Sequence, residues 1–471
     1  MKVYLLNPPA PSGIKMVREG RCMQRKGAWT TVWPPISLAY IAALLRENDC
    51  DVFLNDCIVE EINEDQTIDI IKKINPDLVI INTATASIKN DLAMADLIKK
   101  LDPRIKTAAL GIHVSSLPEE SLNMAAGLDF IIRGEPELTS LELIQAMRDK
   151  KDLSLVEGIS FKRNGQVLSN KDRSLIRDLD SLPFPAWDLI EPGNYPMPFT
   201  DRPFLLLMSG KGCPYACTFC PAEPYYGKKV RLRSPQSLVD EMAWLKDKFG
   251  VKDFLIWSET FTFSRDFVNA VCNQIKLRKL EVSWVCNSRV DTVSLEMLKN
   301  MKTAGCWMVG FGVESGAQEI LDRAKKETTI EQIRNAVSLT KEAGLEVTAH
   351  VIFGLPGETA QTARATIDFI KGLDIDFAQF YCVVPWPSTK IYQEAKQKNW
   401  LLSDDWSLYE QNYSVLNTDT ISAEEVVKYR KQAIREFYFR PKIVWRTLRR
   451  IKSLKELKLF LGMLREFLTW T

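Results

Sequence analysis

Residues 203–220 read PFLLLMSGKGCPYACTFC, an apolar run followed at once by a loop with three cysteines. The run PFLLLMS has the length and composition of a buried strand, and the glycines and proline after it favour a turn. Cys213, Cys217 and Cys220 therefore follow the end of a strand within a span of eight residues. Three thiols in such a loop can bind metal, can include a redox-active pair with the third thiol left free, or can pack as small apolar side chains.

The spacing of the cysteines favours a metal cluster. Three thiolates can hold three irons of a four-iron cluster and leave the fourth iron without a protein ligand. A structural zinc site needs four protein ligands, and no fourth Cys or His lies close in the sequence. If the three thiols only packed in a core, their occurrence together between Gly212 and Pro221 would need another explanation. Zinc and core packing stay open as alternatives.

Further apolar runs follow the cysteines, separated by helical patterns: KDFLIWS, EVSWVCNS, CWMVGFGVES, EVTAHVIFG and DFAQFYCVV. Alternating strands and helices indicate βαβ units and a parallel sheet. Six such repeats are too few for a closed eightfold barrel. We therefore expect residues 201–385 to form a partial (β/α)6 barrel, with its chemistry at the carboxyl ends of the strands.

The rest of the chain divides into three parts. Residues 1–150 alternate short strands with helices, which predicts a Rossmann-like α/β domain. Residues 151–200 contain a hairpin signal around Asn164 and Gly165 and then a proline-rich stretch, which predicts a linker. The alternation stops near residue 386, so residues 386–471 are expected to be mainly helical.

The last residues are basic and amphipathic. Residues 440–470 contain nine Lys or Arg against Glu456 and Glu466. Ser453 can cap a helix on which the leucines follow helical spacing, at positions 454, 457, 461, 464 and 468. Such a helix can rest on anionic lipid, giving peripheral membrane contact, or pack on the barrel mouth as an ordinary helix.

Composition narrows the functional classes. The 471 residues predict two or three domains, and a net charge of +2 gives no signal for nucleic acid. No secretory or membrane-spanning run is visible, so we expect a cytoplasmic location. Ten cysteines are too dilute for a disulfide scaffold. The presence of only two histidines, His113 and His350, argues against a metal site with several histidine ligands and against a histidine-based triad.

The segment CPYACTFC resembles the CxxxCxxC signature of the radical S-adenosylmethionine (SAM) superfamily, with Phe219 at the aromatic position before the last cysteine. The resemblance implies a [4Fe–4S] cluster on Cys213, Cys217 and Cys220, whose open iron chelates SAM. One electron then cleaves SAM to methionine and a 5'-deoxyadenosyl radical. A conventional general base need not take part.

Later segments extend this resemblance. Residues 287–316 resemble the middle strands of the family, and residues 350–359 resemble its fifth strand, whose backbone reads adenine. The family often has Gly where this chain has His350. The resemblance implies SAM contacts from Phe219, Glu259, Arg289, Glu314, Ile352 and Phe353.

The front domain lacks a nucleotide signature. The turn after its first strand reads LNPPAPSG rather than GxGxxG, and proline has no N–H for a phosphate. The domain instead resembles the cobalamin-binding domain of the cobalamin-dependent radical SAM family, and the joint resemblance covers about residues 1–385. It implies corrin contacts from residues at predicted strand ends, namely Pro8, Pro9, Trp33, Pro35, Ser37, Leu38, Thr83, Thr85, Ser87, Gly111, His113, Ser115, Arg133, Gly134 and Glu135.

Three uses of His113 stay open: a cobalt ligand, a contact at the edge of the corrin, or a structural histidine. The cobalt-ligating pattern DxHxxG is absent, because ALGIHVSS lacks the Asp. A front domain that serves only as a scaffold is a further alternative.

The family resemblance implies a cobalamin-dependent C-methyltransferase. The alternatives are an anaerobic oxidative cyclase like the magnesium-protoporphyrin monomethyl ester cyclases, another oxidoreductase of the family, and a non-catalytic cobalamin or cluster sensor. Expected partners are a small-molecule, lipid or peptide substrate and an electron donor such as ferredoxin or flavodoxin. Tyr225, Tyr226, Tyr381 and Trp386 are candidates for the substrate cavity, with loop or core packing as the alternative.

Overall fold

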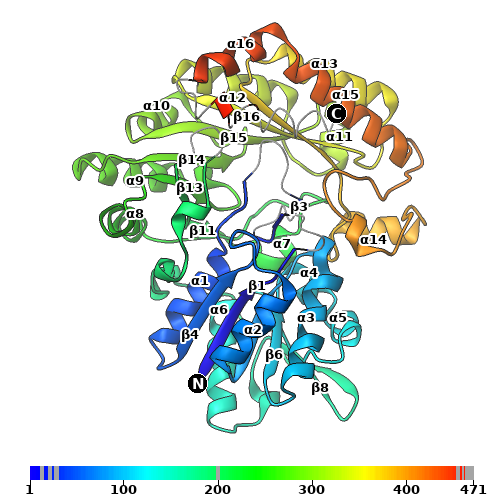
Figure 1. The fold of residues 1–471 in the computed structure, drawn as a ribbon. Coiled ribbons are helices and arrows are strands. Elements are labelled where there is room, and N and C mark those ends of the chain that lie inside the picture. The colour runs from blue at the N-terminus through cyan, green and yellow to red at the C-terminus, as the bar shows by residue number, and fades with distance from the viewer. Residues whose placement is uncertain are drawn as a thin grey trace.

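The computed structural model describes residues 1–10, 15–19, 24–25, 31–197 and 202–451, together with residues 457, 458 and 461. The fold has two sheets of mainly parallel strands, each flanked by helices. The amino-terminal sheet lies at the bottom of Figure 1 and the second sheet at the top. Within the described residues no helix is both long enough and apolar enough to cross a bilayer.

The front sheet has seven strands in the order β4-β1-β5-β6-β7-β8-β9. The first five are parallel: β1 (Lys2–Asn7), β4 (Asp51–Asp56), β5 (Leu78–Asn82), β6 (Lys106–Leu110) and β7 (Phe130–Ile132). The predicted hairpin, β8 (Ile159–Arg163) and β9 (Gln166–Ser169), is antiparallel and extends this sheet at one edge. The Rossmann-like fold predicted for this region is confirmed.

Helices cover both faces of the front sheet (Figure 1). They are α1 (Ile36–Arg46), α2 (Glu64–Ile74), α3 (Ile88–Leu101), α4 (Ile112–Ser116), α5 (Pro118–Met124) and α6 (Pro136–Arg148). Successive side chains of β1 alternate between two cores: Val3 and Leu5 pack with α1 and α6, and Tyr4 and Leu6 with α2 and α3. Strands buried on both faces need nearly continuous apolar sequence, which explains runs such as LVII in β5.

The second sheet has six parallel strands in sequential order. They are β10 (Phe204–Met208), β13 (Asp253–Trp257), β14 (Ser283–Ser288), β15 (Cys306–Glu314), β16 (Glu346–Phe353) and β17 (Phe377–Cys382). The outer helices are α8 (Pro235–Phe249), α9 (Arg265–Leu277), α10 (Leu295–Thr303), α12 (Ile330–Glu342) and α13 (Ala360–Gly372). The predicted partial barrel is confirmed.

Short elements complete the junction between the two sheets. They are β2 (Met16–Val17), β3 (Gln24–Arg25), β11 (Gly210–Lys211), β12 (Arg231–Leu232) and α7 (Ala222–Tyr226). The short helix α11 (Gln318–Arg323) lies in the barrel half, between β15 and α12. Buried ion pairs cross the junction, because Lys211 and Arg231 of the small β11-β12 ladder reach Glu137 and Glu135 at the start of α6.

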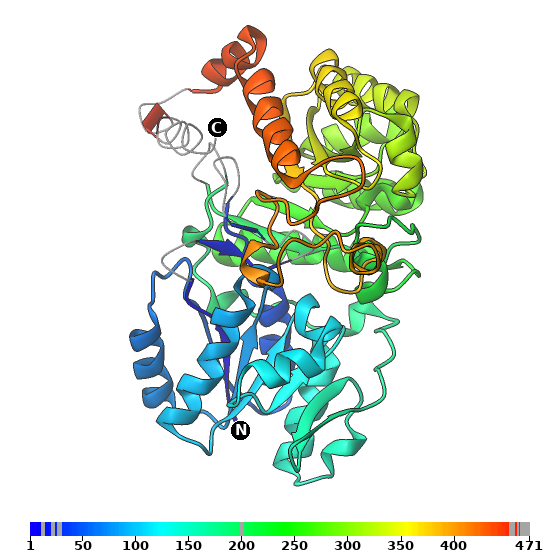
Figure 2. The same ribbon diagram turned by 90° about the vertical axis from the view of Figure 1, so that its right-hand side faces the viewer.

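The carboxyl-terminal region contacts both halves of the molecule. Its helices are α14 (Lys390–Gln397), α15 (Ala423–Tyr438) and α16 (Pro441–Arg450). Helix α15 packs on β17 and α13, whereas Val384, Trp386 and Trp406 join the core of the front domain. Figure 2 shows the orange segment between α14 and α15 running along the junction. The helix predicted at residues 454–468 lies mostly outside the described residues.

Candidate functional site

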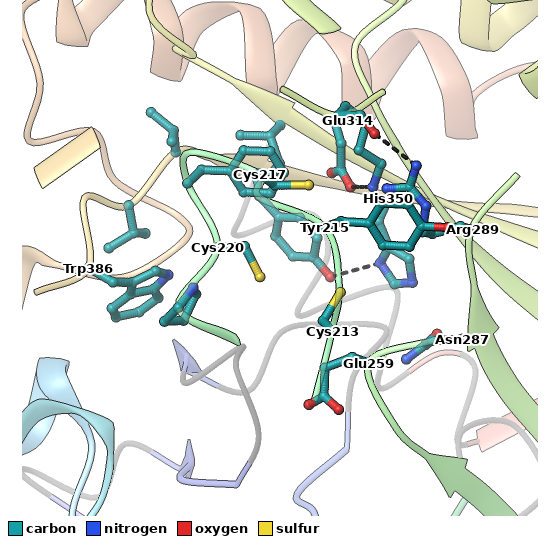
Figure 3. A pocket seen from close by; sticks show the side chains of 18 of the residues that line it. Cys213, Tyr215, Cys217, Cys220, Glu259, Asn287, Arg289, Glu314, His350 and Trp386 are labelled. Atoms are coloured by element: carbon teal, nitrogen blue, oxygen red, sulfur yellow. Dashed lines mark hydrogen bonds and ion pairs between the residues drawn. The ribbon is translucent and has the colours of Figure 1, made fainter. Parts of the chain in front are cut away.

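A cavity of about 180 Å³ opens at the carboxyl ends of the barrel strands. The three cysteines lie on its wall, and Figure 3 shows their sulfur atoms around one space. The predicted SAM contacts Phe219, Glu259, Arg289, Glu314 and Ile352 also line this cavity. Residues separated by up to about 140 positions in the chain therefore meet in one place.

The cysteine loop is held by backbone hydrogen bonds to its surroundings. The Cys213 N–H donates to the carbonyl of Gly227 (3.0 Å), and the Thr218 N–H donates to that of Ala324 (3.0 Å). Gly212 has φ +93°, and a β-carbon there would collide with the carbonyl of Lys229. A side chain at position 212 would therefore push the loop off its support.

The three thiols fit an iron–sulfur cluster. Burial raises the pKa of Cys217 to about 11, while the nearby Lys326 lowers it. Since iron binds thiolate, loading this site must release protons. No three His, Cys, Asp or Glu side chains among the described residues lie close enough to share one metal ion. Thiols spread around a cavity suit a larger cluster that presents a separate iron to each cysteine.

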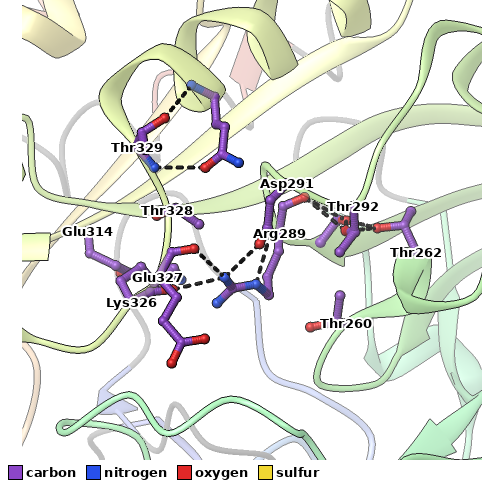
Figure 4. Close-up of polar contacts among 12 residues, drawn as sticks. Thr260, Thr262, Arg289, Asp291, Thr292, Glu314, Lys326, Glu327, Thr328 and Thr329 are labelled. Carbon is purple, nitrogen blue, oxygen red and sulfur yellow. Dashed lines mark hydrogen bonds and ion pairs between the residues drawn. The ribbon is translucent and has the colours of Figure 1, made fainter. Parts of the chain in front are cut away.

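Arg289 is fixed at the cavity wall. Its guanidinium pairs with Asp291 (2.9 Å), donates to the carbonyl of Lys326 (2.8 Å), and lies 3.4 Å from the centre of the Tyr215 ring (Figure 4 shows the polar contacts). Tyr215 lies inside the cysteine loop, so the cation–π contact links this loop to β14. Sequence analysis did not identify Tyr215 or Asp291 as site residues.

Glu314 forms a buried ion pair with Lys326, 2.6 Å from Oε1 to Nζ. Gly312 makes room for the pair, because a β-carbon there would lie 2.5 Å from Glu314 Oε1 and 2.7 Å from Lys326 Nζ. A carboxylate and an ammonium side by side fit the ribose hydroxyls and the charged amino-acid group of SAM. Sequence analysis did not identify Lys326, because nothing in the segment AKKET distinguishes this buried lysine from an exposed one.

Asn287, His350 and Tyr381 form a polar wall on three different strands. His350 stacks on Tyr381 (6.2 Å between ring centres), and the Tyr381 hydroxyl lies 3.5 Å from His350 Nδ1 and donates to Gln379. Gly310 leaves room for this wall, since a β-carbon there would lie 3.0 Å from His350 Nε2 and collide with Asn287.

The aromatic candidates for the substrate cavity separate into two pairs. Tyr381 and Trp386 line the cavity, whereas Tyr225 and Tyr226 line a narrow space of about 20 Å³ between the two halves of the molecule.

Phe353 is not part of the cavity wall. Its side chain is fully buried and stacks on Phe380 (6.2 Å between ring centres). Adjacent side chains of a strand point to opposite faces, so Ile352 faces the cavity and Phe353 the core. A contact from Phe353 through its backbone stays a prediction.

The predicted corrin contacts gather at one edge of the front sheet, where β1, β5, β6 and β7 end and α1 begins. A buried ion pair organises this edge: Arg18 pairs with Asp91 (2.7 Å) and donates to the carbonyls of Pro8 and Pro9 (2.8 and 3.3 Å). Asp91 also accepts from the Ser87 hydroxyl (2.6 Å). Arg18 and Asp91 were not identified from the sequence.

Several other predicted corrin contacts have internal partners. The Ser37 hydroxyl donates to Glu19 (2.9 Å), whose pKa burial raises to about 8. Arg133 pairs with Asp172, and Glu135 with Arg231 (2.6 Å). Two more of them form hydrogen bonds within the fold: the Thr83 hydroxyl donates to the carbonyl of Leu110, and the Ser115 hydroxyl accepts from the Gly134 N–H. Leu38 is buried in the core, Trp33 is half-buried against it, and Pro35 stands at the start of α1. Corrin contact from these residues stays a prediction.

His113 is the buried group at this edge whose nitrogens are both unbonded. Neither Nδ1 nor Nε2 has a hydrogen-bond partner among the described residues, and the Thr85 hydroxyl also lacks one. The imidazole meets the Trp406 ring edge-on (4.8 Å between centres), and burial lowers its pKa to about 3. Gly111 has φ +133°, and a β-carbon there would lie 2.7 Å from the Thr83 carbonyl. The polar atoms of His113 and Thr85 are therefore available to a ligand that carries hydrogen-bonding groups such as amides.

The chain matches two families of known proteins. Residues 207–370 match the radical SAM superfamily, and residues 28–144 match the B12 binding domain. The chain is 33% identical over 444 residues to an uncharacterized methyltransferase of Pyrococcus horikoshii, covering 94% of each protein. It is 31% identical over 373 residues to an anaerobic magnesium-protoporphyrin IX monomethyl ester cyclase of Rubrivivax gelatinosus, covering 78% of this chain and 67% of the cyclase.

The fold also resembles a solved structure of TsrM, a radical SAM methyltransferase from Kitasatospora setae with cobalamin and a [4Fe–4S] cluster bound. The TM-score is 0.70 at 18% identity, with 98% of this chain and 90% of TsrM covered. Because both matched domains stand in this order and the Pyrococcus relative aligns along nearly the whole chain, the protein belongs to the family of radical SAM enzymes that carry a B12-binding domain.

Proposed function

We propose that the protein is a C-methyltransferase that uses a [4Fe–4S] cluster, SAM and cobalamin. The observation that supports this most is the cavity at the barrel's strand ends. Its wall combines the three cysteines with the ion pair of Glu314 and Lys326. When bound, the cluster and SAM supply a 5'-deoxyadenosyl radical, and methylcobalamin supplies the methyl group.

The charged side chains of the cavity would bind and orient SAM. Cys213, Cys217 and Cys220 would ligate the cluster. Glu314 would accept hydrogen bonds from the ribose, and Lys326 would neutralise a carboxylate. Neither side chain needs to rearrange, because their ion pair and Gly312 already set their positions. Such preorganisation keeps the reacting carbon at a fixed distance from its partner.

The remaining wall would bind the substrate. Asn287, His350 and Tyr381 offer hydrogen-bond donors and acceptors, while Val384 and Trp386 exclude water. Radical intermediates need this dry environment. In the front domain, the open nitrogens of His113 and the Thr85 hydroxyl would donate to or accept from the amide groups of the corrin.

Methyl transfer is favoured over oxidative cyclisation by the extent of the alignments. The methyltransferase relative of Pyrococcus aligns at 33% identity over 94% of both proteins. The cyclases align either over a smaller share of their length, 67% for the Rubrivivax protein, or at lower identity, 22% for the Synechocystis protein, which is covered over 88%. A small-molecule substrate and a reduced ferredoxin or flavodoxin as electron donor complete the proposal. A cytoplasmic location is part of it, because free thiols and such donors are typical of a reducing compartment.

The test is anaerobic reconstitution with iron, sulfide and cobalamin, followed by incubation with SAM that carries a deuterated methyl group and with small molecules from a cell extract. We expect about four irons per chain, retained cobalamin, 5'-deoxyadenosine and a product with the labelled methyl group. An oxidised or cyclised product without label would replace methyl transfer by cyclase chemistry. A loaded protein that never cleaves SAM would be a sensor.

A further inference from the structure

Helix α16 carries an apolar face that no other described element covers. The side chains of Val444, Trp445 and Leu448 are 42, 58 and 47% exposed. Most large apolar side chains of the described residues are less exposed than these. The opposite face is docked, because Ile443 is buried and Arg446 pairs with Asp374 (2.7 Å). The helix is therefore fixed to the barrel by one side and open on the other.

The stretch of sequence that contains this open face is rich in positive charge. Residues 440–470 contain nine Lys or Arg against two Glu, while the whole chain has a net charge of only +2. The remainder of the protein is thus net negative. The Arg449 guanidinium lies 4.8 Å from the centre of the exposed Trp445 ring, and no carboxylate pairs with Arg449 in the part of the chain that is described.

The apolar character continues beyond α16. Leu457 and Leu461 are 36 and 52% exposed, so these two leucines are themselves uncovered. An exposed Trp between cations, followed by exposed leucines and further lysines, has the chemistry of a segment that lies in a lipid interface. Lys442 and Arg446 pair with Asp374 within the fold. Anionic lipid would therefore attract Arg449, and the ring of Trp445 would enter the headgroup region.

We propose that α16 binds the surface of an anionic lipid bilayer. This contact would orient the enzyme. Helix α16 is anchored by Asp374 and Asp376, which lie just before the amino end of β17. The cavity lies at the opposite, carboxyl ends of the strands. Figure 1 shows α16 at the top of the molecule, away from the front domain. The bilayer therefore lies behind the barrel, and the cavity faces away from it.

The experiment is cosedimentation of the reconstituted full chain with sucrose-loaded vesicles. We compare phosphatidylcholine alone with a 3:1 mixture of phosphatidylcholine and phosphatidylglycerol. At about 0.1 M salt we expect a partition coefficient about tenfold higher on the anionic vesicles, and a loss of most of that difference at about 0.5 M salt, where charges are screened within a few ångströms. Equal partition on the two vesicles overturns the proposal.

The matched variants are Trp445→Glu and Leu277→Glu. Both replace an exposed apolar side chain on a helix, but Leu277, 78% exposed, ends α9 and lies outside the basic region. Trp445→Glu should lower anionic binding about tenfold, and Leu277→Glu should leave it unchanged, with equal thermal unfolding confirming that both fold. Retained binding in Trp445→Glu overturns the proposal. A wild-type dimer in light scattering that Trp445→Glu dissociates would assign the face to a second copy instead and also overturn it.

Discussion

The barrel cavity and the edge of the front sheet both contain buried charges, but they use them differently. In the barrel, Glu314 and Lys326 form an ion pair that lies on the cavity wall. At the front edge, Arg18 and Asp91 are fully buried and bond to the loops themselves. Among the polar atoms without a partner at the front edge, those of His113 and Thr85 are neutral, whereas Nε of Arg133 belongs to a charged group. The barrel thus presents its ion pair to the cavity, where it can meet a charged ligand such as SAM, whereas the front edge uses its ion pair to hold its own loops.

The largest effect is expected from Cys217→Ala, which tests whether the two sites load independently. Loss of one of three thiolates should abolish the cluster and reduce 5'-deoxyadenosine formation by at least a thousandfold. Cobalamin retention should not change, because the front edge has its own polar groups. Iron content, cobalamin absorbance and deoxyadenosine by chromatography measure the three quantities. Cys272→Ala, in the buried face of α9, is the control that should keep its iron. Loss of cobalamin together with the cluster would contradict independent loading.

The next effect concerns the ion pair that joins the two halves. Arg231→Met leaves Glu135 buried without its cation and should lower the free energy of unfolding by about 3–5 kcal/mol. Lys171→Met, which removes an exposed ion pair with Glu157, should have no measurable effect on the melting temperature. Calorimetry on both variants makes the comparison. If Arg231→Met melts like the wild type, the pair does not hold the junction.

A smaller effect is expected from His113→Phe, which keeps the ring against Trp406 and removes the open nitrogens. The variant without cobalamin should be at least as stable as the wild type, because a buried polar group without a partner costs about 1–3 kcal/mol. Its affinity for cobalamin should fall about tenfold, measured by equilibrium binding. Unchanged affinity would show that His113 is a structural histidine. Thr85→Val gives the parallel test for the hydroxyl.

An effect of similar size is a pH dependence in the barrel. Burial raises the pKa of Glu358 to about 8, although the Gly354 N–H donates to its carboxylate. The folded protein therefore binds the proton more tightly than the unfolded chain, and stability falls as the pH rises from about 4.5 towards 8. Glu358→Gln keeps the acceptor and removes the proton. Relative to this variant, the wild type should lose about 2 kcal/mol between pH 6 and 8 in denaturant titrations. Exposed Glu331→Gln should follow the wild type.

The sequence predicted what depends on local pattern. Both sheets and the hairpin follow from strand periodicity and turn signals, and Cys213 from the spacing of the cysteines. Arg289 and Glu314 were implied by the resemblance to the radical SAM family, and they do line the cavity. Partners that meet only in the folded chain could not be read in this way: Asp91 lies 73 residues from Arg18, and Glu135 lies 96 residues from Arg231. The orientation of Phe353 could have been predicted, because strand alternation opposes it to Ile352.

Val384 and Trp386 belong at once to the wall of the cavity and to the hydrophobic core of the front domain. The front domain cannot tilt against the barrel without carrying part of the substrate wall with it. Cofactor binding in the front domain and substrate entry into the cavity are therefore mechanically linked. The position of the front domain relative to the barrel sets part of the shape that selects the substrate.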